Sequence, residues 1–213
     1  MAFTSYTSID AVIKKHKIRW QAGTVVVPDK TAPLFSATFL AELDINLRDL
    51  PPARSETGAG EVILFPILRE VWKEYRSILS LFTHESLEFD NDLCGYPDYF
   101  ICPRSEFGPF YPQPPYLLVE EAKLDDFEKA WGQCLAAMLA AQKLNGTPDR
   151  PVYGIASNGR AWEFGILLGL DFTRQWGPVA LATLDILSQS LHTVFRACRD
   201  MALAAKAPTP ANP

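Results

Sequence analysis

The sequence predicts an α/β fold in which a central mixed sheet is flanked by helices. Three observations lead to this prediction. The apolar run from Leu117 to Val119 is typical of a central strand that is buried on both faces. The Asn158-Gly159 pair is the dipeptide that favours the tight turn of a β-hairpin. Residues 126–145 and 181–205 carry apolar side chains at helical spacing, so we expect helices beside the strands.

The first fifty residues read as a segment outside this core. Ser8 is a good N-cap for a short amphipathic helix, and residues 18–27 read as extended. A second helix is expected to begin at Thr31-Ala32-Pro33 and to run to about Leu50. We therefore expect residues 1–50 to form an N-terminal helical extension that packs on the core.

The core is expected between residues 51 and 205. A helix over residues 55–72, bent or divided at Pro66, precedes strands at 78–89, 96–102 and 116–124. A helix that ends near residue 145 follows, and then strands at 151–157 and 160–168. The chain closes with a long C-terminal helix, and residues 206–213 are rich in Pro and Ala, so we expect a disordered tail.

Composition excludes several classes of protein. The chain has 213 residues and a net charge of −5, which argues against a dedicated nucleic-acid binder with a uniformly basic face. The four cysteines have no CxxC spacing, so neither a disulfide framework nor a zinc site is expected. The sequence lacks a signal-peptide pattern and a long apolar run. We expect a cytoplasmic protein with no membrane contact.

Charged residues lie at the ends of two apolar strands. Asp98 opens one of these segments, and Glu121 and Lys123 end the next. Because residues two apart on a strand share a face, Glu121 and Lys123 are co-facial and Glu120 points to the opposite face. An antiparallel pairing would place Asp98 opposite Glu121. Two carboxylates with the Ala122 carbonyl make an oxygen site suited to Mg²⁺ or Mn²⁺.

Pro97-Asp98 followed by Glu121-Ala122-Lys123 resembles the motif of the PD-(D/E)XK nuclease superfamily. The order of elements over residues 55–168 is similar to the restriction-endonuclease-like αβββαβ core of that superfamily. The chain also resembles a group of small uncharacterised cyanobacterial proteins that share this core. It departs from the usual pattern in carrying a second acid, Glu120, before Glu121. Residues 1–50 and 170–213 lie outside the resemblance.

The resemblance implies a metal-dependent endonuclease that hydrolyses phosphodiester bonds of DNA. Asp98 and Glu121 would hold the metal, and Lys123 would orient the attacking water or stabilise charge on the phosphate. Gln133 stands where many members carry a glutamine on the following helix. Either Glu56 or Glu61 would be the further acid of the first helix. These two glutamates are five residues apart, on different faces of an α-helix, and the sequence leaves the choice open.

The sequence also allows a second function. A nuclease fold without catalysis would serve as a binding or assembly module, and the acidic net charge favours this alternative slightly. The Asp98, Glu121 and Lys123 set favours catalysis, because a silent module has no physical need for these charges. A homodimer through the C-terminal helix is expected if both strands of a duplex are cut.

Overall fold

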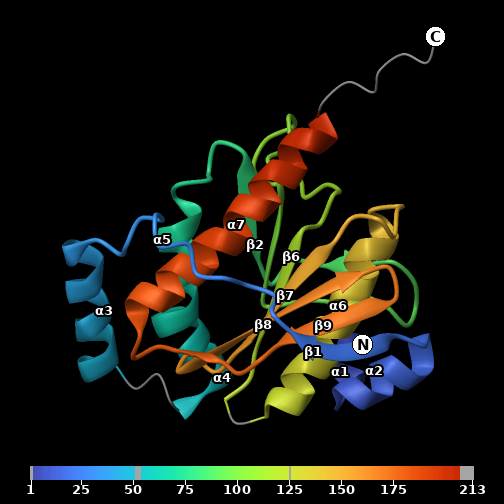
Figure 1. Cartoon of the computed structure of the whole chain (residues 1–213), viewed down its shortest axis with the longest axis horizontal. Helices are drawn as coiled ribbons and strands as arrows, with labels where there is room; N and C mark the ends of the chain where they lie inside the picture. Colours follow the sequence, from blue (N-terminus) through green and yellow to red (C-terminus); the bar gives the residue numbers. More distant parts are fainter. Residues whose placement is uncertain (1, 51–53, 125, 207–213) are drawn as a thin grey trace.

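The computed structural model describes residues 2–50, 54–124 and 126–206, and it shows an α/β protein with a mixed central sheet (Figure 1). Within these residues the sheet runs in the order β1-β9-β8-β7-β6-β5-β2, with β10 paired to β8. Its strands are β1 (Arg19–Gly23), β2 (Leu79–Thr83), β5 (Tyr99–Pro103), β6 (Leu118–Ala122), β7 (Val152–Ser157), β8 (Ala161–Leu168), β9 (Asp171–Gln175) and β10 (Val179–Ala180). A separate two-stranded ribbon joins β3 (Leu87–Glu88) to β4 (Cys94–Gly95).

Helices cover both faces of the sheet (Figure 1). One face packs against α3 (Ala37–Asp49), α4 (Glu56–Ala59), the π-helix η2 (Gly60–Leu64), α5 (Phe65–Trp72) and the long C-terminal α7 (Leu184–Lys206). The other face packs against α1 (Ala2–Ser5), α2 (Ile9–His16) and α6 (Phe127–Leu144). No helix in the described part of the chain is long and apolar enough to cross a membrane.

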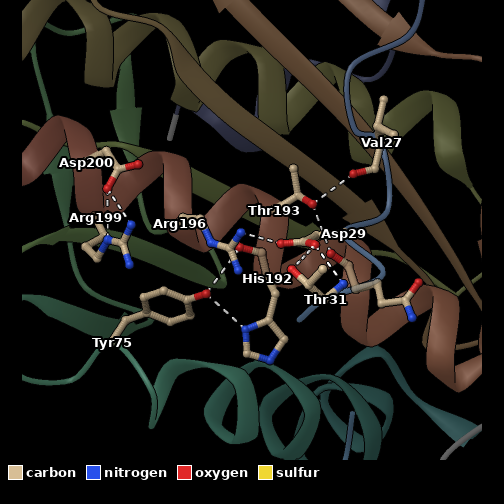
Figure 2. Close-up of polar contacts among 10 residues, drawn as sticks. Val27, Asp29, Thr31, Tyr75, His192, Thr193, Arg196, Arg199 and Asp200 are labelled. Atoms are coloured by element: carbon tan, nitrogen blue, oxygen red, sulfur yellow. Dashed lines mark hydrogen bonds and ion pairs between the residues drawn. The ribbon is translucent and has the colours of Figure 1, made fainter. Parts of the chain in front are cut away.

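The segment before residue 51 is tied closely to the core. β1 lies at one edge of the central sheet, where it pairs in parallel with β9 from Arg19 opposite Asp171 to Gly23 opposite Gln175. After β1 the chain runs along α7, and Figure 2 shows Asp29 of this connection beside Arg196 of the helix. Val27 accepts a hydrogen bond of 2.9 Å from the Thr193 hydroxyl. The segment expected as an N-terminal extension therefore adds strand β1 to the sheet and contacts α7 through Val27 and Asp29.

Two expectations about element bounds were wrong for local reasons. The second N-terminal helix begins after Ser36, whose hydroxyl accepts from the Phe39 N–H at 3.2 Å, and not at 31–33. Thr31 instead donates its backbone N–H and its hydroxyl to the Asp29 carboxylate, and this side-chain turn replaces a helical start. The strand expected at 78–89 ends at Thr83, because His84 has a φ of 51° that no extended strand adopts.

Other elements follow the expected order. Asp126 caps α6 by accepting the Lys129 N–H at 2.9 Å. Asn158 and Gly159 join β7 to β8 in an antiparallel hairpin. Helical structure continues from Glu56 to Trp72, and the irregularity expected from Pro66 takes the form of the π-helix just before it. The tail expected at 206–213 falls almost wholly outside the described residues, which end at Lys206.

Candidate active site

Pairing between β5 and β6 brings the two predicted carboxylates to one end of the sheet. The antiparallel ladder sets Ile101 opposite Leu118 and Tyr99 opposite Glu120. The next position along this register sets Asp98 opposite Glu121. The Asp98 carboxylate accepts a hydrogen bond of 2.8 Å from the Ala122 N–H, so the side chain of one segment is fixed to the backbone of the other.

Lys123 lies at the centre of the charged cluster. Its Nζ is 3.7 Å from Glu121 Oε2 and 3.4 Å from Glu56 Oε2, and it donates a hydrogen bond of 2.7 Å to the Ala122 carbonyl. Only 10% of its side chain is exposed. Lys123 follows the last residue of β6, and from this position its ammonium contacts both Glu121 and Glu56 of α4.

Burial changes the proton affinities of this cluster. Burial raises the pKa of Glu121 well above its usual value, the nearby Asp98 raises it further, and Lys123 opposes both. Burial lowers the pKa of Lys123, but Glu121, Asp98 and Glu56 outweigh that effect and leave it raised. Asp98, Glu121 and Glu56 are thus three acids around one ammonium, and a bound cation would favour the ionised forms of the buried carboxyls.

Glu120 is the least satisfied charged residue of the strand. It is 1% exposed, and neither carboxylate oxygen has a hydrogen-bond partner among the described residues. Its neighbours Leu118 and Ala122 belong to the apolar cluster under α5 and α7, whereas Val119 belongs to the cluster under α6, as strand alternation requires. Burial, Asp98 and Glu121 together raise the pKa of Glu120 well above its usual value.

A pocket of about 100 Å³ opens beside Asp98 and contains both candidate helix acids. Its lining residues are Glu56, Thr57, Gly60, Glu61, His84, Asp98, Tyr99 and Ala122. Glu56 and Glu61 were expected on different helix faces, yet both line this pocket. Glu61 lies in the π-helix that begins at Gly60, where the Phe65 N–H donates to the Gly60 carbonyl, so Glu56 and Glu61 do not share one regular α-helix.

Gln133 lies on α6, which covers the face of the sheet toward which Glu121 points by strand alternation. It is 4% exposed within α6 and does not line the pocket. In the described residues it makes no hydrogen bond to Asp98, Glu121 or Lys123. Its position is that of a buried helix residue on the α6 side of the sheet, where burial and then Glu121 raise the pKa of the neighbouring Cys134.

His84 and Tyr99 belong to the site although sequence reasoning did not select them. The His84 Nδ1 lies 3.5 Å from Asp98 Oδ1, and its backbone N–H donates to the Asp98 carbonyl at 3.0 Å. Within the strand expected at 78–89, a histidine at this position reads as an ordinary surface residue. The register between β2 and β5 would have identified it, because pairing Thr83 with Tyr99 sets the next residue, His84, opposite Asp98. Burial, followed by Glu120, Asp98 and Glu61, raises the pKa of the Tyr99 hydroxyl.

The oxygen atoms gathered at this site are of the kind that bind a hard divalent cation. Asp98, Glu121 and the Ala122 carbonyl offer oxygen ligands, and burial keeps the pKa of Glu121 raised although Lys123 opposes the shift. In the arrangement described, however, no three His, Cys, Asp or Glu residues converge on one point closely enough to hold a metal ion. Lys123 instead donates to the Ala122 carbonyl. Binding of a metal by this set would require the Lys123 ammonium to leave that oxygen.

Comparison with known proteins adds no assignment, because the chain matches no protein-family model and no curated protein.

Proposed function

We propose that this protein is a metal-dependent nuclease of the PD-(D/E)XK type that hydrolyses phosphodiester bonds of DNA. The observation that carries the proposal is the meeting of Asp98, Glu121 and Lys123 at one end of β5 and β6, tied by the Asp98–Ala122 hydrogen bond. The order α4–α5, β2, β5, β6, α6, β7 supports it, since this is the αβββαβ order of the restriction-endonuclease-like fold.

The proposed chemistry assigns a role to each residue. Asp98, Glu121 and the Ala122 carbonyl would hold Mg²⁺ or Mn²⁺, which supplies a Lewis acid for the phosphoryl oxygen and a bound water of lowered pKa. Lys123 would orient the attacking water or balance the charge that develops on the phosphate. Glu56 positions Lys123 through their ion pair, and Glu61 faces the same pocket.

Gln133 has a narrower role in this scheme. The resemblance implies that Gln133 hydrogen-bonds to DNA or to a group that supports the metal ligands. The Gln133 side chain is buried in α6. We therefore propose that Gln133 acts by holding α6 against β6. Substitution of Gln133 should alter stability more than cleavage.

A catalytically silent binding or assembly module is the second candidate. Two observations favour it: the Lys123 ammonium already contacts the Ala122 carbonyl, and the chain has a net charge of −5. A silent module would still bind DNA or a protein partner but would show no metal-dependent cleavage.

A cleavage assay separates the two candidates. Wild-type protein is incubated with supercoiled plasmid, single-stranded DNA and branched DNA in Mg²⁺ or in Mn²⁺, beside Asp98→Ala and Lys123→Ala. Lys14→Ala is the matched control, because Lys14 forms an exposed ion pair with Asp10 on α2. Nicking by wild type and Lys14→Ala alone supports the nuclease. Equal inertness of all four proteins on every substrate would exclude it.

Metal titration by calorimetry tests the site without relying on turnover. Wild type and Lys14→Ala are expected to bind Mn²⁺ with the same affinity, and Asp98→Ala is expected to lose that binding. If Asp98→Ala bound Mn²⁺ as wild type does, the metal would be held elsewhere. The homodimer expected for double-strand cleavage is checked separately, by light scattering of the free protein and of the protein bound to duplex.

A further inference from the structure

A bulge projects a tryptophan from the sheet between β9 and β10. Both strands pair antiparallel with β8, with Arg174 opposite Gly165 and Val179 opposite Trp162. Between these two pairs β8 covers three residue steps and the opposite segment covers five, so two residues are extra. Gly177, at φ 70°, supplies the left-handed conformation that such a bulge needs. Trp176, Gly177 and Pro178 are all exposed as a result.

The backbone of Trp176 is fixed on this bulge, whereas its side chain is exposed. Its backbone N–H donates to the Gly23 carbonyl of β1 at 3.1 Å, which fixes the main chain at the sheet edge. The side chain is 72% exposed. In contrast, Trp131 and Trp162 are fully buried. An indole presented to solvent from a fixed backbone offers a flat apolar face at little further conformational cost.

The bulge lies at the same end of the sheet as the candidate active site. One row of paired residues crosses the strands from Ala122 to Ser157, from Ser157 to Trp162 and from Trp162 to Val179. Three strand spacings separate Ala122 from Val179, which is about 14 Å. Trp176 comes three residues before Val179. A nucleic-acid strand that enters the active site can span this distance with a few nucleotides.

An exposed arginine, Arg160, lies on the hairpin between the strands that carry Ala122 and Val179. Arg160 lies on the hairpin that joins Ser157 to Trp162, and its carbonyl accepts from the Leu181 N–H at 2.7 Å. Its side chain is exposed, and in the described part of the chain its guanidinium forms no ion pair. An unpaired guanidinium and an exposed indole at the same end of the sheet match the alternation of phosphate and base along a single strand.

We propose that Trp176 stacks on an unpaired base and that Arg160 contacts a phosphate of the same strand, so that the preferred substrate is single-stranded DNA or a single-stranded arm. The inference rests on the proposed nuclease function for its choice of nucleic acid. A paired base within a duplex exposes no face to the indole. Stacking therefore discriminates between single-stranded and duplex DNA, whereas Arg160 contributes to both.

The test measures binding rather than cleavage. Fluorescence anisotropy of a fluorescein-labelled oligothymidylate is followed in EDTA, so that no metal-dependent cleavage occurs. Trp176→Ala is expected to weaken binding about tenfold or more, and Trp176→Phe to retain most of the affinity. Trp20→Ala is the matched control: Trp20 is a 49% exposed tryptophan of β1 that pairs with Phe172, away from the site end. Arg160→Ala is expected to weaken binding and to reduce its salt dependence.

Each outcome bears on the inference. Selective loss in Trp176→Ala, with Trp20→Ala and the circular dichroism spectrum unchanged, supports it. Absence of wild-type binding, equal loss in both tryptophan variants, or an equal loss of duplex binding in Trp176→Ala overturns it. Lys14→Ala, which changes an exposed ion pair on α2, is included because it should bind as wild type does. Binding that depends on Trp176 without cleavage in Mn²⁺ would contradict the nuclease and leave the surface supported.

Discussion

The carboxylate of Asp98 accepts a hydrogen bond of 2.8 Å from the backbone N–H of Ala122. This contact links the segment before β5 to the last residue of β6, and it orients one oxygen of Asp98 toward the strand while the other faces His84 at 3.5 Å. The same residue thus has a structural role and a proposed catalytic role. The two roles can be separated because they use different properties of the side chain.

Asp98→Asn and Asp98→Ala should therefore behave differently. Asparagine keeps an oxygen that can accept from Ala122, so we expect its free energy of unfolding to remain near that of wild type. Alanine leaves the buried N–H without a partner, which should cost about 1–3 kcal/mol. Both variants should lose metal-dependent cleavage, because neither supplies a carboxylate. Urea unfolding and the nicking assay check the two effects, and cleavage by Asp98→Asn would contradict the metal-ligand role.

Lys123→Met should destabilise the protein in a pH-dependent manner. Removing the ammonium leaves Glu121 buried without its ion-pair partner, which should cost about 3 kcal/mol near neutral pH. Glu121 has a raised pKa in the folded protein, and loss of Lys123 should raise it further. A carboxyl with a raised folded pKa gains stability as the pH falls toward its unfolded value, so the deficit should shrink toward pH 5. Lys14→Met should show no such dependence.

Glu120→Gln should stabilise the protein at neutral pH. Because burial, Asp98 and Glu121 raise the folded pKa of Glu120, the ionised carboxyl is favoured in the unfolded chain and disfavoured in the folded one. The neutral amide avoids that penalty, and each pKa unit of difference corresponds to about 1.4 kcal/mol. The advantage over wild type should vanish as the pH falls to about 4.5, where the unfolded carboxyl is also protonated. A lower melting temperature for Glu120→Gln at pH 7 would show that Glu120 is ionised and paired.

Gly132→Ala should weaken the attachment of the N-terminal helices. A Cβ at this position of α6 would lie 2.8 Å from backbone atoms of Ser8, the N-cap of α2. Backbone cannot move aside as a flexible side chain can, so we expect a loss of about 1–3 kcal/mol in unfolding free energy. Gly132→Ser should be at least as harmful. Wild-type stability of Gly132→Ala would mean that α2 can shift away from α6 at no cost.

The strand pattern predicted the centre of the site better than its surroundings. Alternation along residues 118–122 sets Glu120 and Glu121 on opposite faces, because that rule is local, whereas Lys123 follows the last strand residue and contacts Glu56 of α4. The positions of His84, Glu61 and Trp176 depended on a break in a strand, a π-helix and a bulge, which arise from interactions between distant segments. Pairing of β1 with β9 joins residues about 150 positions apart, and no local pattern indicates it.

Acid should destabilise the protein partly through His192, a buried residue of α7. Its Nδ1 lies 3.0 Å from the Tyr75 hydroxyl (Figure 2). Glu74, Arg196 and Asp29 are the charged groups that act on its pKa. Burial lowers the pKa of His192 below its usual value of 6.5. As the pH falls below about 6.5, the unfolded chain takes up a proton that the folded protein does not, so stability decreases.

His192→Gln should remove this part of the pH dependence. Between pH 7.5 and pH 5.5, wild type should lose about 1 kcal/mol more unfolding free energy than the variant, as measured by urea titration at each pH. His16→Gln is the comparison, since burial also lowers the pKa of His16 beside Asp92. The double variant should show the smallest loss of the four proteins, because both groups act in the same direction. An unchanged loss in His192→Gln would show that Tyr75 and Glu74 accommodate a protonated His192 within the fold.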